Sequence, residues 1–227
     1  ETNTGAFNFG AGVSADSGVL GSFSITQKNF DITDLPDSWG ELVNGEAFHG
    51  AGQTFTIMAQ PGSRVRNFSI GLSDPYAFGT DYSAGASLYY RDRLYRSYTE
   101  TRTGLELRAG RRFGSRWTLS VPLRIEHIRL SSIDDDAPTE YFDEADGQTL
   151  YSLGATLTRQ SYDNVATPSK GSKIEVSLEQ FGGDANFSHL RAEYARIFRL
   201  HENVLGEKTV LTLSSKLGYI PQDSESV

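Results

Sequence analysis

The feature that most limits the fold of this chain is a two-residue alternation of apolar and polar side chains. It is clearest in residues 1–27, where one set of alternate positions holds Phe7, Phe9, Ala11 and Val13, and the other holds Asn8, Gly10, Gly12 and Ser14. A period of two over this length is typical of a β-strand with one apolar face. Turn residues at 16–18 are followed by a second alternating stretch, so the segment is predicted to be a β-hairpin.

The same period returns along the rest of the chain. Nine further segments carry apolar residues at alternate positions, namely 55–59, 68–72, 82–90, 105–109, 117–125, 151–157, 174–178, 190–194 and 211–219. With the hairpin they predict about eleven strands. Two irregularities lie in the seventh strand. Pro122 cannot donate a ladder hydrogen bond, which favours a bulge nearby, and Ile128 and Leu130 have the opposite parity, which predicts a change of phase after Glu126.

Two longer segments lack this alternation. Residues 28–52 contain a proline, a tryptophan and several acids, and they are predicted to form a long connection with one helical turn near residues 37–43, capped by Asp37 or Ser38. Residues 131–147 are strongly acidic and are predicted to form a solvated surface loop.

The alternation alone could belong to a soluble β-sandwich or to a membrane barrel. Two observations favour the barrel. Charged residues occupy the centres of the polar strand faces, and short turns alternate with long polar loops along the chain. The charged positions are Glu106, Arg108, Arg124, Glu126, Glu175, Glu179, Arg191, Glu193 and Lys216. We therefore expect an all-β fold, an antiparallel transmembrane β-barrel with Leu107, Leu119, Leu157, Val176 and Leu213 facing lipid. The mean hydropathy of −0.40 is compatible with this, because only every second residue of a barrel strand is apolar.

Several function classes are disfavoured by composition. The net charge of −8 argues against a nucleic-acid partner, which would need a basic surface. The four histidines lie in separate segments without a recognisable catalytic motif, so no enzyme activity is expected. The acidic residues between 134 and 144 lack the spacing of a calcium loop, and the chain has no cysteine, so no metal and no cofactor are expected.

Four motifs carry a resemblance to a known family. They are N-T-G-A-F-N-F-G at residues 3–10, G-A-G-Q at 50–53, S-D-P-Y at 73–76 and S-Y-D-N-x-x-x-P-S-K-G-S at 161–172. In this order they resemble the barrel of BamA-type outer-membrane assembly factors. The resemblance implies that residues 1–227 are a partial outer-membrane β-barrel domain, with about eleven of about sixteen strands. Periplasmic repeat domains and the last strands would then lie outside this sequence, and the protein would be a multi-pass protein of the bacterial outer membrane.

The resemblance also implies a function. Such proteins insert other β-barrels into the membrane through a lateral seam, where the first strand offers its edge to an incoming strand. The expected gate residues are Thr4, Gly5, Ala6, Phe7, Asn8, Phe9, Gly10, Ala11, Gly12 and Val13. The expected partners are outer-membrane lipid, client β-barrel proteins and periplasmic subunits of an assembly complex. The alternative is an outer-membrane pore or translocator, of the two-partner secretion type or a porin.

Overall fold

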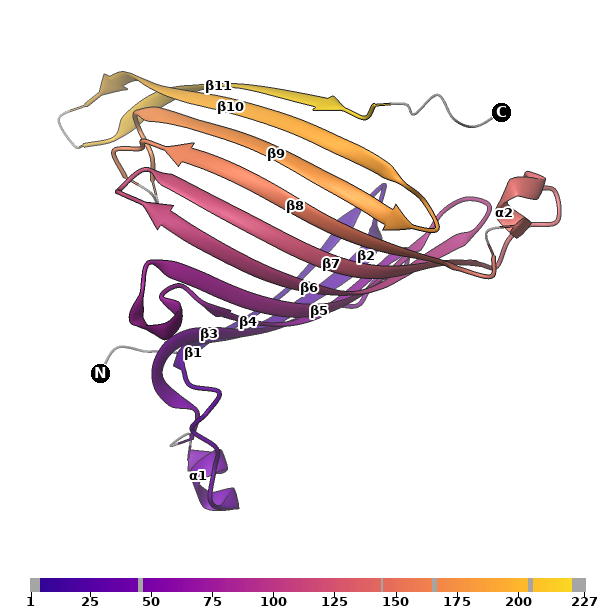
Figure 1. Cartoon of the computed structure of the whole chain (residues 1–227), viewed down its shortest axis with the longest axis horizontal. Helices are drawn as coiled ribbons and strands as arrows, with labels where there is room; N and C mark the ends of the chain where they lie inside the picture. Colours follow the sequence, from indigo (N-terminus) through magenta and orange to yellow (C-terminus); the bar gives the residue numbers. More distant parts are fainter. Residues whose placement is uncertain (1–4, 45–46, 144, 165–166, 204–205, 222–227) are drawn as a thin grey trace. The chain divides into compact units, whose positions relative to one another are not determined.

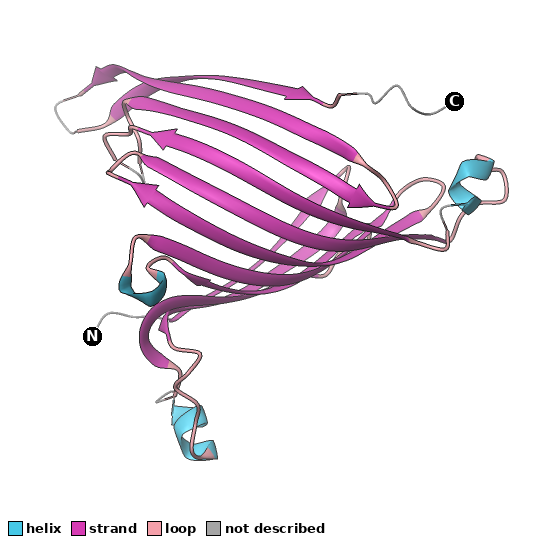
Figure 2. Cartoon of the chain, viewed as in Figure 1, coloured by secondary structure: helices cyan, strands magenta, loops and turns pink. Residues whose placement is uncertain are grey.

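The computed structural model describes residues 5–44, 47–143, 145–164, 167–203 and 206–221. Eleven antiparallel strands follow one another in the sheet in the order of the sequence (Figures 1 and 2). They are β1 (Gly5–Ser14), β2 (Gly18–Phe30), β3 (His49–Gln60), β4 (Val65–Asp74), β5 (Tyr82–Leu94), β6 (Thr99–Phe113), β7 (Trp117–Ser131), β8 (Gln148–Gln160), β9 (Gly171–Gly183), β10 (Phe187–Glu202) and β11 (Lys208–Tyr219). The strands predicted from the alternation are thus confirmed, and most extend beyond their alternating segments.

The seventh strand differs from the prediction. β7 is unbroken from Trp117 to Ser131, and side-chain exposure alternates between more and less exposed from Val121 to Ser131. The expected change of phase after Glu126 is therefore wrong, because Ile128 and Leu130 lie on the same face as Glu126, and Leu130 is buried. Pro122 fits inside the strand beside Gly154, where an added Cβ would come within 3.1 Å of its ring.

The connections contain two short α-helices. Helix α1 (Trp39–Asn44) lies in the long segment between β2 and β3, as predicted. Ser38 accepts a hydrogen bond from the Glu41 amide at 3.3 Å, and the Glu41 carboxylate accepts one from the Asp37 amide at 2.8 Å. This reciprocal arrangement resembles a capping box. Helix α2 (Thr139–Asp143) lies within the acidic segment, which was predicted to be a loop.

Apolar side chains gather on the outside of the strands rather than in an interior. Among the described residues the buried apolar side chains are Ala47, Ala77, Leu130 and Ile197. In contrast, Leu88, Leu153 and Leu213 expose 54%, 57% and 54% of their surface. An apolar surface on this scale needs a non-aqueous environment or a partner. Within the described ranges, no helix combines the length and apolar character required to cross a membrane.

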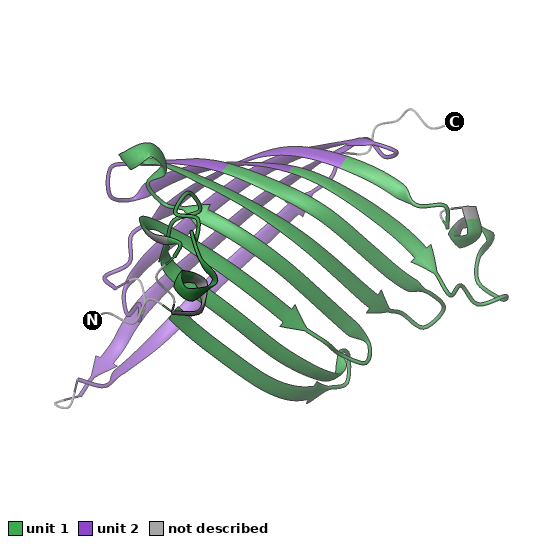
Figure 3. Ribbon diagram, turned by 90° about the horizontal axis from the view of Figure 1, so that it is seen from below, with its two compact units in different colours: residues 1–108, 124–150 green, residues 109–123, 151–227 purple. Residues whose placement is uncertain are grey.

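The chain divides into two compact units, which Figure 3 colours green and purple. The first unit comprises residues 1–108 and 124–150, and the second comprises residues 109–123 and 151–227. In the first unit the turns that follow β1, β5 and β7 contact one another. Arg93, near the end of β5, lies 3.1 Å from Asp16, and the Asp134 amide donates to the Ser97 carbonyl at 2.9 Å. These turns share one rim, as strict up-and-down connectivity predicts.

In the second unit, Asp163 organises the turn between β8 and β9. Its carboxylate accepts hydrogen bonds from the amides of Ser169 and Lys170 and from the Ser169 hydroxyl, and it also lies 3.4 Å from Arg199 of β10. These hydrogen bonds hold the pKa of Asp163 well below its usual range. The Ser169 hydroxyl contributes most, and the two amides contribute less. The S-Y-D-N-x-x-x-P-S-K-G-S motif thus has a structural role: it folds the turn around one carboxylate.

Candidate functional site: the first strand and the charged inner face

β1 is the first strand of the sheet order, and β2 is its neighbour. The two strands pair without interruption in ten residue pairs, from Gly5 opposite Gln27 to Ser14 opposite Gly18. One edge of β1 is therefore fully occupied by β2. Among the described strands, the other edge has no neighbour in that order, and it is the edge at which a further strand could add.

The side chains of β1 are covered on neither face, because all ten of its residues are exposed. Phe7, Phe9 and Val13 expose 62%, 84% and 82% of their surface. The Phe7 ring meets the Phe23 ring of β2 edge-on, with centroids 4.8 Å apart. These residues form an apolar face that suits lipid, as expected from the sequence, while Ala11 adds little area to it.

The opposite face of β1 is nearly bare. Asn8 donates a hydrogen bond to the Ser24 hydroxyl at 3.4 Å, which is long for such a bond. Next to it, Gly10 and Gly12 have no side chains. A Cβ added at Gly12 would meet nothing within 4 Å, and one at Gly10 would lie 2.9 Å from the Ser22 hydroxyl. Cross-strand side-chain pairs stabilise a sheet, and this face of β1 has few of them.

The tip of the hairpin is held more firmly than the strand itself. Arg64 donates to the Ala15 carbonyl at 3.0 Å, and Ser63 accepts a hydrogen bond from the Val19 amide at 3.1 Å. Together with the ion pair between Arg93 and Asp16, these contacts fix the turn between β1 and β2. Of the ten gate residues predicted from the sequence, Gly5 to Val13 lie in β1, and Thr4 lies outside the described residues.

The polar faces of β5, β6 and β7 in the first unit carry a charged network. Glu106 lies 2.5 Å from Arg108 and 3.0 Å from Arg124. On the same face, Glu126 lies 3.1 Å from Arg102 and accepts a hydrogen bond from the Tyr89 hydroxyl at 2.6 Å. The predicted polar face is therefore an inner face in which carboxylates and guanidinium groups compensate one another.

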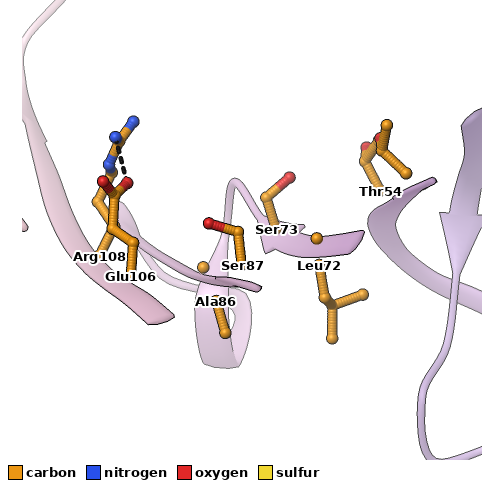
Figure 4. A pocket seen from close by; sticks show the side chains of 10 residues that line it. Thr54, Leu72, Ser73, Ala86, Ser87, Glu106 and Arg108 are labelled. Carbon is orange, nitrogen blue, oxygen red and sulfur yellow. Dashed lines mark hydrogen bonds and ion pairs between the residues drawn. The ribbon is translucent and has the colours of Figure 1, made fainter. Parts of the chain in front are cut away.

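A small cavity of about 310 Å³ borders this network. Ser73, Ser87, Glu106 and Arg108 point to one side of the sheet there, whereas Leu72 and Ala86 point to the other (Figure 4). Such a surface suits water and polar chain segments. No group of three or more histidines or acids in the described part of the chain is placed to hold a metal ion.

The comparisons with known proteins identify the family. Residues 48–226 match the Omp85 superfamily domain. The chain belongs to the Omp85 superfamily. It is 22% identical over 199 residues to the outer membrane protein assembly factor BamA of Neorickettsia risticii, covering 86% of this chain and 24% of that protein.

The fold comparison agrees with the family. The crystal structure of BamA from Haemophilus ducreyi lacking POTRA domains 1–3 matches with a TM-score of 0.73 and 18% identity, over 99% of this chain and 42% of that one. The chain thus has the fold of part of a BamA barrel, and it spans about a quarter of the length of the curated relative. As a BamA-type Omp85 protein it is a partial β-barrel of the bacterial outer membrane, which confirms the predicted fold and location.

Proposed function

We propose that this barrel inserts other β-barrel proteins into the outer membrane, and that β1 is the strand at which a client begins to pair. The observation that carries the proposal is the side-chain character of β1. Phe7, Phe9 and Val13 expose most of their surface, and a Cβ added at Gly12 would meet nothing within 4 Å, so few side-chain contacts fix the strand. The edge that does not pair with β2 is the one at which a strand from another chain would add. An exposed edge can template a strand from another chain, which is the chemistry of β-augmentation.

The side chains of β1 support the same proposal. Phe7, Phe9 and Val13 keep the strand in lipid, while Gly10 and Gly12 leave its other face without cross-strand packing. A partner strand at the outer edge would therefore be held mainly by backbone hydrogen bonds. Such a partner can be exchanged for a client strand of any sequence, because recognition by the backbone does not depend on side chains.

No covalent chemistry is needed for this activity. The proposed partners are client barrels, outer-membrane lipid and periplasmic subunits of an assembly complex, in keeping with the name of the Neorickettsia relative as an assembly factor. The full-length protein would supply the last strand that closes against β1. The free energy of insertion would come from burying the client's apolar face in lipid and from completing its backbone hydrogen bonds.

A pair of disulfides in the full-length protein tests the proposal. In the first variant, Asn8→Cys is tied to a cysteine on the facing last strand, which should abolish insertion of client barrels into proteoliposomes while the barrel stays folded. In the matched control, Asn8→Cys is tied to Ser24→Cys within the hairpin, where the two side chains already touch at 3.4 Å. The control should insert clients at the normal rate.

The two variants differ only in which edge of β1 is locked. Normal insertion by the first variant, with its disulfide verified by mass spectrometry, would contradict a gate at β1 and favour a pore or translocator. Loss of insertion in both variants would mean that the whole hairpin must move, which also contradicts the proposal. Heat-dependent mobility of each variant on a gel reports whether the barrel is folded.

A further inference from the structure

A second feature lies in the second unit, on the outward face and at the rim that carries the turn after β8. The outward residues of β10 are apolar at Leu190, Ala192 and Tyr194 and then change to Arg196. In register with them, β9 changes from Ile174, opposite Tyr194, to Ser172, opposite Arg196. On β8 the apolar series ends at Leu157 and continues with Arg159. The outward faces of β8 and β9 therefore change from apolar to polar at this level, whereas on β10 Arg196 is a single cationic residue that is followed by Phe198 and Leu200.

A groove of about 580 Å³ opens at this level. We call it the rim groove, and its lining residues are Arg159, Ser161, Lys170, Gly171, Ser172, Arg196, Ile197, Phe198 and Arg199. It is lined by four cationic residues and by no acidic residue, although the chain as a whole has a net charge of −8. Arg199 is neutralised by Asp163 and Glu202, at 3.4 and 2.6 Å. Arg159, Lys170 and Arg196 form no ion pair within the described residues.

The two arginines that flank the groove rest on aromatic rings. The Arg159 guanidinium carbon lies 5.9 Å from the centre of the Trp117 ring, and that of Arg196 lies 5.1 Å from the centre of the Phe198 ring. This cation–π contact orients a guanidinium without using its N–H donors. Between the arginines, the hydroxyls of Ser161 and Ser172 lie 3.2 Å apart. The Ser161 hydroxyl donates to the Ser172 carbonyl at 3.3 Å, so the Ser172 hydroxyl can turn its proton toward a ligand.

We propose that the rim groove binds the phosphate of an anionic phospholipid headgroup. Guanidinium groups bind phosphate oxygens through two parallel hydrogen bonds, and serine hydroxyls add a neutral donor. The position selects a lipid over a soluble phosphate, because the apolar residues that precede Arg159 and Arg196 on the same strands face acyl chains in an outer-membrane barrel. In addition, Trp117 lies where aromatic residues commonly meet the headgroup level. This proposal depends on membership of the membrane-barrel family and not on the insertase activity.

The test uses the full-length protein in phosphatidylcholine nanodiscs that contain a minor fraction of phosphatidylglycerol. Native mass spectrometry counts the phosphatidylglycerol molecules that stay bound after release from the disc. Arg159→Gln combined with Arg196→Gln should lower this retention about tenfold, because each basic residue adds appreciably to the attraction of an anionic lipid. The matched control is Arg191→Gln, which removes a guanidinium from the opposite face of β10 and should leave retention unchanged.

Further measurements keep the proposal falsifiable. Heat-dependent gel mobility checks that each variant is folded. If the double variant does not fold, the single variant Arg196→Lys tests the proposal instead. It keeps the positive charge but loses the bidentate guanidinium, and it should lower phosphatidylglycerol retention about threefold. Unchanged retention in the folded double variant, or an equal loss in Arg191→Gln, would overturn the proposal. Displacement of the lipid by free glycerol 3-phosphate at equal concentration would assign the groove to a soluble phosphate and overturn the lipid assignment.

Discussion

β1 and β7 are both antiparallel strands with one apolar and one polar face, yet different interactions hold them. β7 contributes Arg124 and Glu126 to the inner face, where they bind Glu106 and Arg102 of β6 and Tyr89 of β5. β1 contains no charged residue, and its polar face offers Asn8 and two glycines. Backbone pairing is common to both strands, so the side-chain network is what distinguishes them. Under the proposed function, β1 is the strand that exchanges its partner and β7 is fixed in the barrel.

The largest effect on this comparison should come from a charge on the outward face of β7. Leu123 exposes 43% of its surface near the centre of the strand. Leu123→Arg should destabilise the folded barrel by about 2–4 kcal/mol, the cost of an arginine near the bilayer midplane. Urea titration in lipid vesicles measures it. Ser120→Arg, on the inner face of the same strand, is the control and should cost far less; equal costs would show that the two faces are misassigned.

A smaller effect is expected from the charged network. Glu106→Gln removes the charge that joins Arg108 and Arg124, and it should lower the free energy of unfolding by about 1–2 kcal/mol, since hydrogen bonds to charged groups exceed neutral ones. Asn8→Ala in β1 should change it by less than about 0.5 kcal/mol, the usual range for exposed positions. The same titration in vesicles compares the two variants. A loss in Asn8→Ala as large as that in Glu106→Gln would contradict the distinction between the strands.

The sequence predicts much of this picture, because a period of two determines which side of a strand each residue occupies. The alternation alone assigns Phe7 to the apolar face and Glu106 to the polar face. It does not predict that Glu106 binds Arg124, because the alternation fixes the side of a residue but not the register between strands. The unbroken course of β7 escapes the sequence for a related reason: Pro122 is accommodated by Gly154 of another strand.

The rim groove illustrates the same limit. The pair Arg196 and Phe198 is visible in the sequence, since residues two apart in a strand share a face. The contact between Arg159 and Trp117 cannot be predicted from the sequence. The two residues belong to different strands, β8 and β7, and the contact depends on the register between them. In the sequence, Arg196 interrupts an apolar face, as an arginine at the membrane rim can. The structure adds the second arginine and the two serines that turn this interruption into a candidate binding site.

The smallest predicted change in stability concerns the glycines of β1, and it bears most directly on the proposed function. The space beside Gly12 is open on the side where a Cβ would project, so Gly12→Thr can be accommodated without strain. A β-branched residue there should add cross-strand packing against Leu20, its partner in β2, and stabilise the hairpin by about 0.2–1 kcal/mol. If weak packing on this face makes β1 exchangeable, the same substitution should slow client insertion in proteoliposomes, although the barrel is more stable. Gly182→Thr, also in open space but far along the chain in β9, is the control and should leave the insertion rate unchanged. A stabilised Gly12→Thr variant that inserts clients at the normal rate would separate the stability of β1 from its activity, and the bare face of β1 would then have no part in the gate.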